Sequence, residues 1–398
     1  MNFVYISPNF PDAAWKFCAA LKNNGVRVLG IGDAPYDELS TNLKNALTDY
    51  YKVSNLLNYD EVYRGCAKFT WQYGRIDWLE SNNEFWLEQD ARLRTDFNIS
   101  TGIKLDQIGM IKNKSEMKKY YAEGNIRTAR QIKASKGLSA ARHFAEEAGF
   151  PLFAKPDVGV GANGTCKINN EKELDSFFIN NNEISDYVIE EYVTGNICDY
   201  DAIIDSNGNP IFESWSICPP SIADIVKYNL DSIYHVEKDM NENLRYWGRQ
   251  TVKAFGVKSR FVHLEFFQLD RAHRGLGNVG DFVALEVNMR PGGGFTPDML
   301  NYAHSVDVYK IWADMVAFDH RTTPDPHDDF YCVFAGRRDG VKYRLDHQQM
   351  MDKYKDALKQ WDRVPDALSG AMGNQSYIAR FRTEEEKNQF ISDIYDRI

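Results

Sequence analysis

The sequence predicts an α/β protein whose chain begins with a doubly wound parallel sheet and continues into a smaller α+β unit. Residues 3–6 and 26–31 are short apolar segments that flank a helical segment at 13–23, and this strand–helix–strand order is typical of a parallel sheet. Residues 113–193 alternate helical and strand-like segments around a glycine-rich loop, which predicts a compact lid. Further along, two apolar strands each carry a glutamate where an apolar residue is expected.

Composition places the chain among globular proteins of about two or three domains. Of its 398 residues, 43% are hydrophobic and 26% are charged, and the formal net charge is -10. This charge, with no run of Lys and Arg, argues against nucleic-acid binding. The 6 cysteines form no CxxC pair, so neither a disulfide framework nor a zinc site is indicated. No signal peptide and no apolar run of roughly 20 residues is present, so we expect a cytoplasmic protein without a membrane span.

The first unit, residues 1–112, is expected to be the parallel α/β domain. Gly25 marks the end of its first helix, and the following strand closes at Gly32. No GxGxxG motif is present there, so the sequence gives no support to dinucleotide binding. Helices with acidic faces are expected from there to residue 112.

The second unit, residues 113–193, is expected to fold as the lid. Ser115 is placed to cap a helix that ends at Gly124. The other expected elements are helices at 138–148 and 171–179 and strands at 150–155, 165–168 and 187–193.

The third unit, residues 194–320, is expected to hold the functional site, and residues 321–398 are expected to complete or flank it. A Ser-Asn-Gly-Asn turn predicts a hairpin between 200–205 and 210–217. Residues 219–257 are expected to be mostly helical. The later expected elements are a helix at 305–318, strands at 331–335 and 376–380, and a helix from 383.

A cluster of polar side chains is expected where two strands of the third unit meet. Glu265 lies in one strand, and Glu286, Asn288 and Arg290 alternate along the next, so these three point the same way. A polar, glycine-rich connection at 270–280 suits a hairpin between the two strands. Two carboxylates and an amide oxygen suit Mg²⁺, and the guanidinium suits an anion beside it. The alternative is a surface salt bridge between the glutamates and the arginine.

The lid carries groups that suit phosphate. Lys155 ends an apolar strand just before a loop with glycines at 159, 161 and 164, and such a loop lets backbone N–H groups approach phosphate oxygens. The loop is not a Gx4GK[ST] motif, and an ordinary turn is the alternative. Lys114 lies in a charged segment, where a solvated helix face is the alternative.

The last strand of the lid offers backbone groups to a nucleotide base. It ends in Glu190, Glu191, Tyr192 and Val193. Its amides and carbonyls suit an adenine edge, with one of the two glutamates facing a donor amine. Asp199 and Asp201 are placed to reach a ribose hydroxyl. Solvated charges on an edge strand and on a hairpin are the alternatives.

The order of these segments resembles the ATP-grasp superfamily, the fold of biotin carboxylase, carbamoyl phosphate synthetase and D-alanine–D-alanine ligase. The resemblance covers residues 110–320, and the start of the chain is similar to the Rossmann-like domain that usually precedes this fold. It implies that Lys114 and Lys155 contact ATP phosphates and that the loop 159–164 closes over them. It also implies that residues 190–193 hold adenine, with Asp199 or Asp201 near the ribose.

The resemblance further implies a two-metal site. Glu265 and Glu286 would bind one Mg²⁺, and Glu286 and Asn288 a second, with Mn²⁺ as an alternative ion. Arg290 would stabilise charge on the phosphoryl group in transfer. Family members typically phosphorylate a carboxylate with ATP, and a nucleophile, often an amine, then displaces the phosphate.

The implied acceptor site lies near the metals, at residues 290–298 and 216–235. The residues considered there are Tyr228, Tyr234 and His235, with His263 either lining the pocket or packed in the core. Glycines 292–294 would bring backbone amides to a substrate carboxylate or form a simple turn.

The chain departs from biotin carboxylases after Arg290. Those enzymes continue with a Val-Glu-His segment, whereas this chain continues with Pro-Gly-Gly-Gly-Phe-Thr-Pro. The expected function is therefore an ATP-dependent carboxylate–amine ligase, with amino acids among its substrates. A bicarbonate-using carboxylase or carbamoyl-phosphate-synthetase-like enzyme and an ATP-binding module without turnover are the alternatives. Small-molecule substrates and a homodimer are the expected partners.

Overall fold

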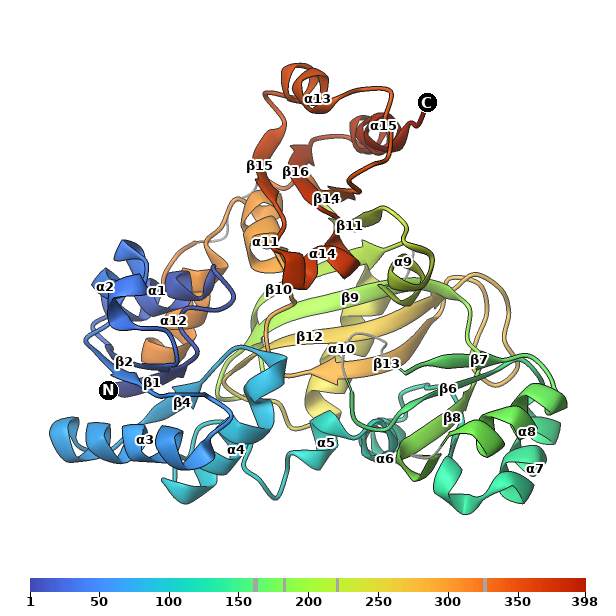
Figure 1. Ribbon diagram of the computed structural model, residues 1–398, viewed down its shortest axis with the longest axis horizontal. Helices are drawn as coiled ribbons and strands as arrows, with labels where there is room; N and C mark the ends of the chain where they lie inside the picture. The colour runs from blue at the N-terminus through green and yellow to red at the C-terminus, as the bar shows by residue number, and fades with distance from the viewer. Residues whose placement is uncertain (160–163, 182–183, 220–221, 325–327) are drawn as a thin grey trace.

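The computed structural model describes residues 1–159, 164–181, 184–219, 222–324 and 328–398. These residues form a four-stranded N-terminal sheet, an eight-stranded central sheet and a four-stranded lid sheet. The N-terminal sheet and the lid lie at opposite ends of the molecule, with the central sheet between them (Figure 1). Within the described ranges, no helix is long and apolar enough to cross a membrane.

The N-terminal sheet is parallel and doubly wound, which confirms the prediction. Its strands have the order β3-β2-β1-β4, and every pair is parallel. Apolar residues of α1 and α2 pack on one face, and those of α3 pack on the other. The strands are β1 (Asn2–Ile6), β2 (Arg27–Gly32), β3 (Asp49–Lys52) and β4 (Trp78–Glu80). The helices are α1 (Ala14–Asn23), α2 (Thr41–Ala46), α3 (Tyr59–Tyr73) and α4 (Leu87–Asp96).

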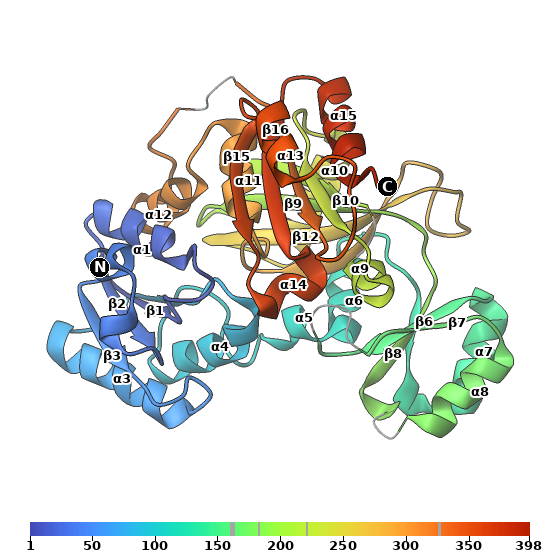
Figure 2. The same ribbon diagram turned by 45° about the horizontal axis from the view of Figure 1, so that its top comes forward.

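The lid is an antiparallel sheet with one covered face. Its order is β5-β8-β6-β7, and α7 and α8 pack on the apolar face through residues such as Leu174 and Ile189 (Figures 1 and 2). The strands are β5 (Gln131–Lys133), β6 (Leu152–Pro156), β7 (Cys166–Ile168) and β8 (Tyr187–Glu191). The helices are α7 (Leu138–Ala148) and α8 (Glu171–Asn180). The predicted loop glycine Gly161 lies outside the described residues.

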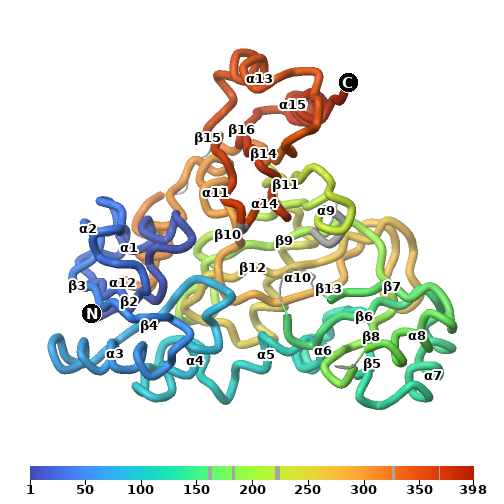
Figure 3. The backbone as a smooth tube through the Cα atoms, viewed as in Figure 1, coloured from blue at the N-terminus to red at the C-terminus, as the bar shows by residue number. Residues whose placement is uncertain are grey.

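Two short helices join the N-terminal sheet to the lid, and the tube in Figure 3 shows this path. They are α5 (Gly109–Lys112) and α6 (Lys114–Glu123). Helix α6 contacts the central sheet at β13 and helix α10. It therefore lies where the lid and the central sheet meet.

The central sheet has the order β13-β12-β9-β10-β11-β14-β16-β15. The predicted hairpins are present, because β9 pairs β10 and β12 pairs β13 in antiparallel fashion. The strands are β9 (Gly195–Ile204), β10 (Pro210–Cys218), β11 (Ser232–Val236), β12 (Arg260–Leu269), β13 (Phe282–Asn288), β14 (Tyr331–Arg337), β15 (Leu358–Arg363) and β16 (Gln375–Phe381). The last three strands come from the C-terminal segment, which thus completes the sheet at the end opposite β13; Figure 1 shows them at the top of the view.

The prediction that residues 219–257 are mostly helical is wrong for β11. This strand stands between α9 (Ile222–Tyr228) and α10 (Glu242–Ala254) and pairs β10 and β14. Five residues give too short a pattern to separate a strand from its helical surroundings, and its two neighbours supply the backbone partners.

The expected helix at 305–318 is shorter, and another precedes it. Helices α11 (Thr296–His304) and α12 (Val308–Phe318) are separated by Ser305, which has a left-handed φ of 50°. Both pack in the core shared by the N-terminal and central sheets. Three further helices, α13 (His347–Lys353), α14 (Asp366–Met372) and α15 (Glu384–Tyr395), belong to the C-terminal segment.

A buried ion network joins the N-terminal sheet to the central sheet. Arg260 of β12 donates to Glu80 at the end of β4, and Arg94 of α4 lies 2.9 Å from the same carboxylate. All three side chains are at most 5% exposed. Removing one partner leaves a buried charge uncompensated, which makes such a network a point of high sensitivity.

Arg260→Ala is therefore expected to lower the free energy of unfolding by about 3–5 kcal/mol. Urea denaturation of the variant and the wild type measures this loss. The control is Arg363→Ala, which removes an exposed pair with Asp339 and should leave the free energy of unfolding nearly unchanged. Equal losses in the two variants would show that the buried network does not hold the sheets together.

Candidate functional site

Two rows of polar side chains cross four neighbouring strands on one face of the central sheet. The first row consists of Ser216, Asp199, Glu265 and Glu286, which are successive cross-strand partners. The second row consists of Ser214, Asp201, His263 and Asn288, which are also successive partners. Because side chains alternate along a strand, the residues between them point to the other face, where Tyr200 and Leu264 enter an apolar core.

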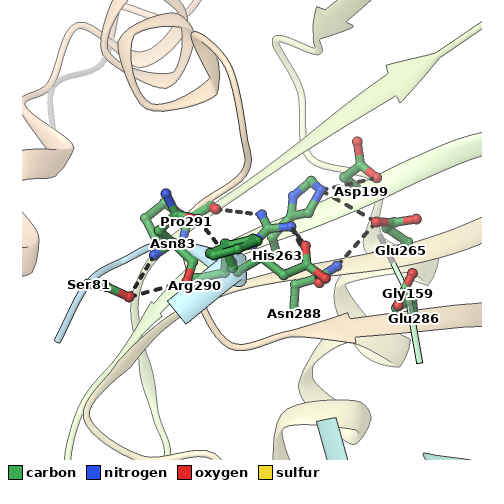
Figure 4. Close-up of polar contacts among 12 residues, drawn as sticks. Ser81, Asn83, Gly159, Asp199, His263, Glu265, Glu286, Asn288, Arg290 and Pro291 are labelled. Carbon is green, nitrogen blue, oxygen red and sulfur yellow. Dashed lines mark hydrogen bonds and ion pairs between the residues drawn. The ribbon is translucent and has the colours of Figure 1, made fainter. Parts of the chain in front are cut away.

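Glu265 and Glu286 lie directly opposite each other on β12 and β13, as the sequence predicts. Asn288 Nδ2 donates to Glu265 Oε1 at 3.2 Å (Figure 4). Burial, together with the Glu286 carboxylate, raises the pKa of Glu265 to about 8. The two carboxylates thus repel each other, and a cation bound between them would relieve this repulsion.

These residues fit Mg²⁺ that arrives with a nucleotide. Within the described part of the chain, no three His, Cys, Asp or Glu side chains are grouped closely enough to hold a metal ion. Mg²⁺ is, however, usually held by one or two carboxylates and by substrate phosphates. Glu265, Glu286 and the Asn288 amide supply that protein share.

Arg290 is paired with a residue from the N-terminal unit. Its Nη2 donates to Glu84, and its Nη1 donates to the Pro291 carbonyl at 2.8 Å. The Nε of Arg290 is buried and has no hydrogen-bond partner among the described residues. Burial would raise the pKa of Glu84, but Arg290 outweighs it and lowers that pKa. Figure 4 shows Ser81 and Asn83 of the same loop beside Arg290.

Glu84 is a residue that the sequence analysis missed. It lies in a short 3-10 helix, Glu84–Trp86, shortly after β4. Ligands of open α/β sheets gather at the carboxyl ends of the strands. The position after β4 is therefore the signal that would have drawn attention to it.

Lys114 lies against the glutamate pair. Its Nζ is 3.2 Å from Glu286 Oε1 and 3.1 Å from the carbonyl oxygen of Gly159. The start of α6 is fixed by Asp157, whose carboxylate accepts hydrogen bonds from the amide and hydroxyl of Ser115 at 2.7 and 2.6 Å. The helix therefore brings a lysine to both the metal-type carboxylates and the glycine loop. The third glycine of that loop, Gly164, has a left-handed φ of 74°.

Lys155 shares one carboxylate with a second lysine. Glu190 Oε2 is 2.7 Å from Lys155 Nζ, and Glu190 Oε1 is 2.9 Å from Lys118 Nζ. Burial would raise the pKa of Glu190, but the two lysines outweigh it and lower that pKa to about 2. Lys118 was missed because its segment reads as a solvated helix face. Its spacing of four from Lys114 places both on the same face of α6, which is the signal that could have found it.

Glu190→Gln is expected to destabilise the protein more at neutral pH than in acid. The folded pKa is about 2, below the unfolded value of about 4.3, so the stabilisation is complete above pH 4.3 and is lost as pH falls towards 2. We expect a loss of about 3 kcal/mol at pH 7 and about half of that at pH 3. Urea denaturation at both pH values measures it. A loss that does not change with pH would contradict the ion-pair origin.

The rest of the expected adenine segment is firmly packed. The Glu191 carboxylate holds Arg130, accepting from its amide at 2.7 Å and from its guanidinium at 2.8 and 3.0 Å. Val193 is buried beside Leu269 and Val283. The ring of Tyr192 lies under Lys167, with 4.0 Å from Nζ to the ring centre. Glu190 is therefore the glutamate of this segment that faces α6.

Asp199 and Asp201 are buried in the two rows and are not hairpin surface charges. Asp199 accepts from Ser216 Oγ at 3.0 Å, and Asp201 Oδ1 lies 2.9 Å from His263 Nδ1. Burial would lower the pKa of His263, but Asp201, Asp199 and Glu265 together raise it to about 9. His263 thus belongs to the polar face rather than to an apolar core.

The other candidate residues divide between the two faces. Tyr234 is half-buried and stacks on Phe334, with ring centres 4.9 Å apart. His235 of β11 is the cross-strand partner of Ile217 on β10. Ile217 is adjacent to Ser216 in the strand and points to the opposite face, so His235 also points away from the polar rows. Tyr228 is exposed at the end of α9. Gly294 has a left-handed φ of 61°, and an added Cβ there would meet Met372, so this turn requires glycine.

The fold matches solved structures along nearly the whole chain. The L-amino acid ligase from Bacillus licheniformis matches with a TM-score of 0.70 at 13% identity, over 98% of this chain and 95% of that one. Phosphoribosylglycinamide synthetase from Anaerococcus prevotii matches with a TM-score of 0.68 at 13% identity, over 99% and 98%. The biotin carboxylase domain of 2-oxoglutarate carboxylase from Hydrogenobacter thermophilus, crystallised with MgADP and bicarbonate, matches with a TM-score of 0.70 at 16% identity, over 100% and 90%.

Sequence comparison gives a shorter match. D-alanine–D-alanine ligase of Francisella philomiragia is 27% identical over 154 residues, which are 37% of this chain. The match spans 48% of that relative, about half of its length. No family model matches the sequence. The full-length structural matches show that the chain has the fold of these proteins, which is the ATP-grasp fold.

Proposed function

We propose that the protein is an ATP-dependent, ADP-forming ligase that joins a carboxylate to an amine through an acyl phosphate. One observation carries this proposal. The carboxylates of Glu265 and Glu286 lie opposite each other on β12 and β13, and the Lys114 ammonium contacts Glu286. Arg290 follows β13, and its guanidinium lies beside Asn288. Such a group suits phosphoryl transfer, which depends mostly on positioning and on neutralising charge.

In this proposal each residue holds one part of the reactants. Lys114 and Lys155 contact the ATP phosphates, and the loop with Gly159, Gly161 and Gly164 closes over them. Glu265, Glu286 and Asn288 hold two Mg²⁺ ions, which neutralise phosphate charge when bound. Residues 190–193 hold the adenine.

The reaction has two steps, and its atoms balance. A substrate carboxylate oxygen attacks the γ-phosphorus of ATP, and ADP leaves, with Arg290 placed to neutralise charge on the phosphoryl oxygens. The amine nitrogen then attacks the acyl carbon, inorganic phosphate leaves, and the nitrogen releases a proton as the amide forms. Excluding water from the acyl phosphate is the task of the lid.

Amino acids are the substrates that we favour. The fold matches an L-amino acid ligase over nearly its whole length, and part of the sequence matches a D-alanine–D-alanine ligase.

A bicarbonate-using carboxylase is the second candidate. The match to a biotin carboxylase domain crystallised with bicarbonate favours it. Against it, residues 291–297 read Pro-Gly-Gly-Gly-Phe-Thr-Pro and supply no acid next to Arg290. The next acid, Asp298, is bound to Lys16 at 2.7 Å.

Release of ADP from Mg·ATP tests the proposal. The protein is incubated with pooled carboxylic acids, amino acids included, with and without pooled amines and bicarbonate. ADP that appears only with a carboxylate, and faster with an amine, supports the ligase. ADP with bicarbonate alone would support the carboxylase, and bound ATP without any ADP would support a binding module.

A further inference from the structure

A buried carboxylate holds the loop that follows β4. Asp90 of α4 is fully buried, and its Oδ2 accepts hydrogen bonds from the Ser81 amide at 3.0 Å and from the Ser81 hydroxyl at 2.6 Å. Arg94 Nη2 lies 3.9 Å from the same oxygen and balances its charge. Hydrogen bonds to an ionised acceptor are stronger than those between neutral groups, so Ser81 is firmly fixed relative to the helix.

The Ser81 hydroxyl extends this anchor into the loop. Its oxygen also accepts a hydrogen bond from the Asn83 amide at 3.2 Å (Figure 4). The Asn83 side chain in turn accepts a hydrogen bond from the Phe85 amide at 3.0 Å and so caps the short helix that begins at Glu84. The backbone on both sides of Glu84 is therefore tied, through Ser81, to Asp90.

Glu84 joins this loop to Arg290. Its carboxylate accepts a hydrogen bond from Arg290 Nη2, and the two side chains are only 20% and 13% exposed. Arg290 Nη1 donates to the carbonyl of its own neighbour, Pro291, whereas Nε has no hydrogen-bond partner among the described residues. Glu84 is thus the contact that comes from a distant segment, and the position of the guanidinium depends on where the loop places this carboxylate.

We infer that Asp90 is a positioning residue for the reaction, because it fixes the guanidinium of Arg290 through the loop 81–84. This inference rests on the proposed function, in which Arg290 neutralises charge on the transferred phosphoryl group. Asp90 itself is too deeply buried to touch a substrate. A small misplacement of a group that must meet the developing charge slows a reaction strongly, so a distant anchor of that group affects the rate.

Ser81→Ala tests the inference with a small change. It removes the hydroxyl but leaves Arg290, Glu84 and the buried carboxylate in place. Single-turnover ADP formation with the active substrate pool should be about tenfold slower, with the dissociation constant of ADP unchanged. Asp90→Asn removes the charge of the anchor and should act in the same direction. Should Asp90→Asn fail to fold, Ser81→Ala still decides the test.

The chain contains a matched control for this contact. Asp314 of α12 is also fully buried, and its Oδ2 accepts hydrogen bonds from the Thr322 amide at 3.0 Å and from the Thr322 hydroxyl at 2.6 Å. Helix α12 packs against α1. Asp314→Asn therefore removes the same kind of buried anchor at another place, and it should leave the rate of ADP formation unchanged.

A double-mutant cycle separates positioning from general loss of structure. If Ser81 acts on the reaction only through Arg290, adding Ser81→Ala to Arg290→Ala should slow the reaction no further. General damage to the fold would instead multiply the two losses.

The environment of Arg290 can also be followed without any substrate. In protein labelled with nitrogen-15 arginine, the Nε–H signal of Arg290 is the one that is absent from Arg290→Ala. This signal should shift in Ser81→Ala and in Asp90→Asn, but not in Asp314→Asn.

The outcomes separate the inference from the proposed function. An unchanged Arg290 signal, an unchanged rate in Ser81→Ala, or losses that multiply in the cycle would overturn the inference even if the ligase reaction is found. A shifted signal in a protein that forms no ADP under any condition would overturn the proposed function, but it would support Asp90 as the residue that positions Arg290.

Discussion

Glu286→Gln is expected to reduce carboxylate-dependent ADP formation by at least about a thousandfold. Glu286 faces Glu265 across β12 and β13 and also contacts Lys114, so it is the carboxylate common to the proposed metal and phosphate contacts. A neutral amide can still accept a hydrogen bond, but it does not neutralise a divalent cation. Steady-state ADP release, with Mg·ATP and the active substrate pool, measures the loss.

The same substitution is not expected to destabilise the fold. Glu286 contributes to the raised pKa of Glu265, so its removal relieves a repulsion in the folded protein. Thermal unfolding should therefore show a variant at least as stable as the wild type. The control is Glu384→Gln on α15, where the side chain is 64% exposed, and its activity should be unchanged. A Glu286→Gln enzyme with a near-wild-type rate would remove this glutamate from the reaction.

Arg290→Ala is expected to keep ATP binding but to slow the chemical step by about 10²–10⁴-fold. In the proposed reaction, its guanidinium neutralises charge that develops on the phosphoryl group rather than charge present in free ATP. The loss should therefore appear in kcat, with the dissociation constant of ADP nearly unchanged. Single-turnover ADP formation, combined with calorimetric ADP binding, separates the two quantities.

Two further variants sharpen this prediction. Arg290→Lys keeps a positive charge but loses the planar fork, so it should recover only part of the rate. Glu84→Gln removes the charge paired with Arg290 and leaves the guanidinium in place, so it should impair turnover less than Arg290→Ala does. An Arg290→Ala enzyme that loses nucleotide affinity and keeps its kcat would reassign the arginine to binding.

The metal-type cluster could be predicted because its geometry follows from local rules. Alternation along a strand puts Glu286 and Asn288 on one face, and a glycine-rich connection pairs their strand with that of Glu265. Residues 3–31 likewise form the expected parallel pair of strands around a helix. In both places, the residue pattern that predicts the structure and the residues that form the structure lie in the same short stretch of sequence.

The missed features depend on contacts between distant segments. Glu84 contacts Arg290 across 206 positions of the sequence, and Lys118 gains its partner Glu190 only when β8 lies beside α6. Strand β11 is defined by its neighbours β10 and β14 more than by its own five residues. The spacing of residues within a short segment does not show which distant segment it contacts, so these features could not be predicted from a single sequence.

The order of strands in the central sheet also bears on how the chain reaches its working form. The polar rows lie on β10, β9, β12 and β13, but the same sheet continues through β11 into β14, β16 and β15, which come from residues 331–381. Until those residues leave the ribosome, β11 has no partner on its outer side and presents an open edge to other chains. The N-terminal sheet, by contrast, needs only residues 2–80 for its pairing. During synthesis, the N-terminal sheet can therefore form before the central sheet has received β14, β15 and β16. A product truncated before these strands would expose the aggregation-prone edge of β11 beside an otherwise assembled site.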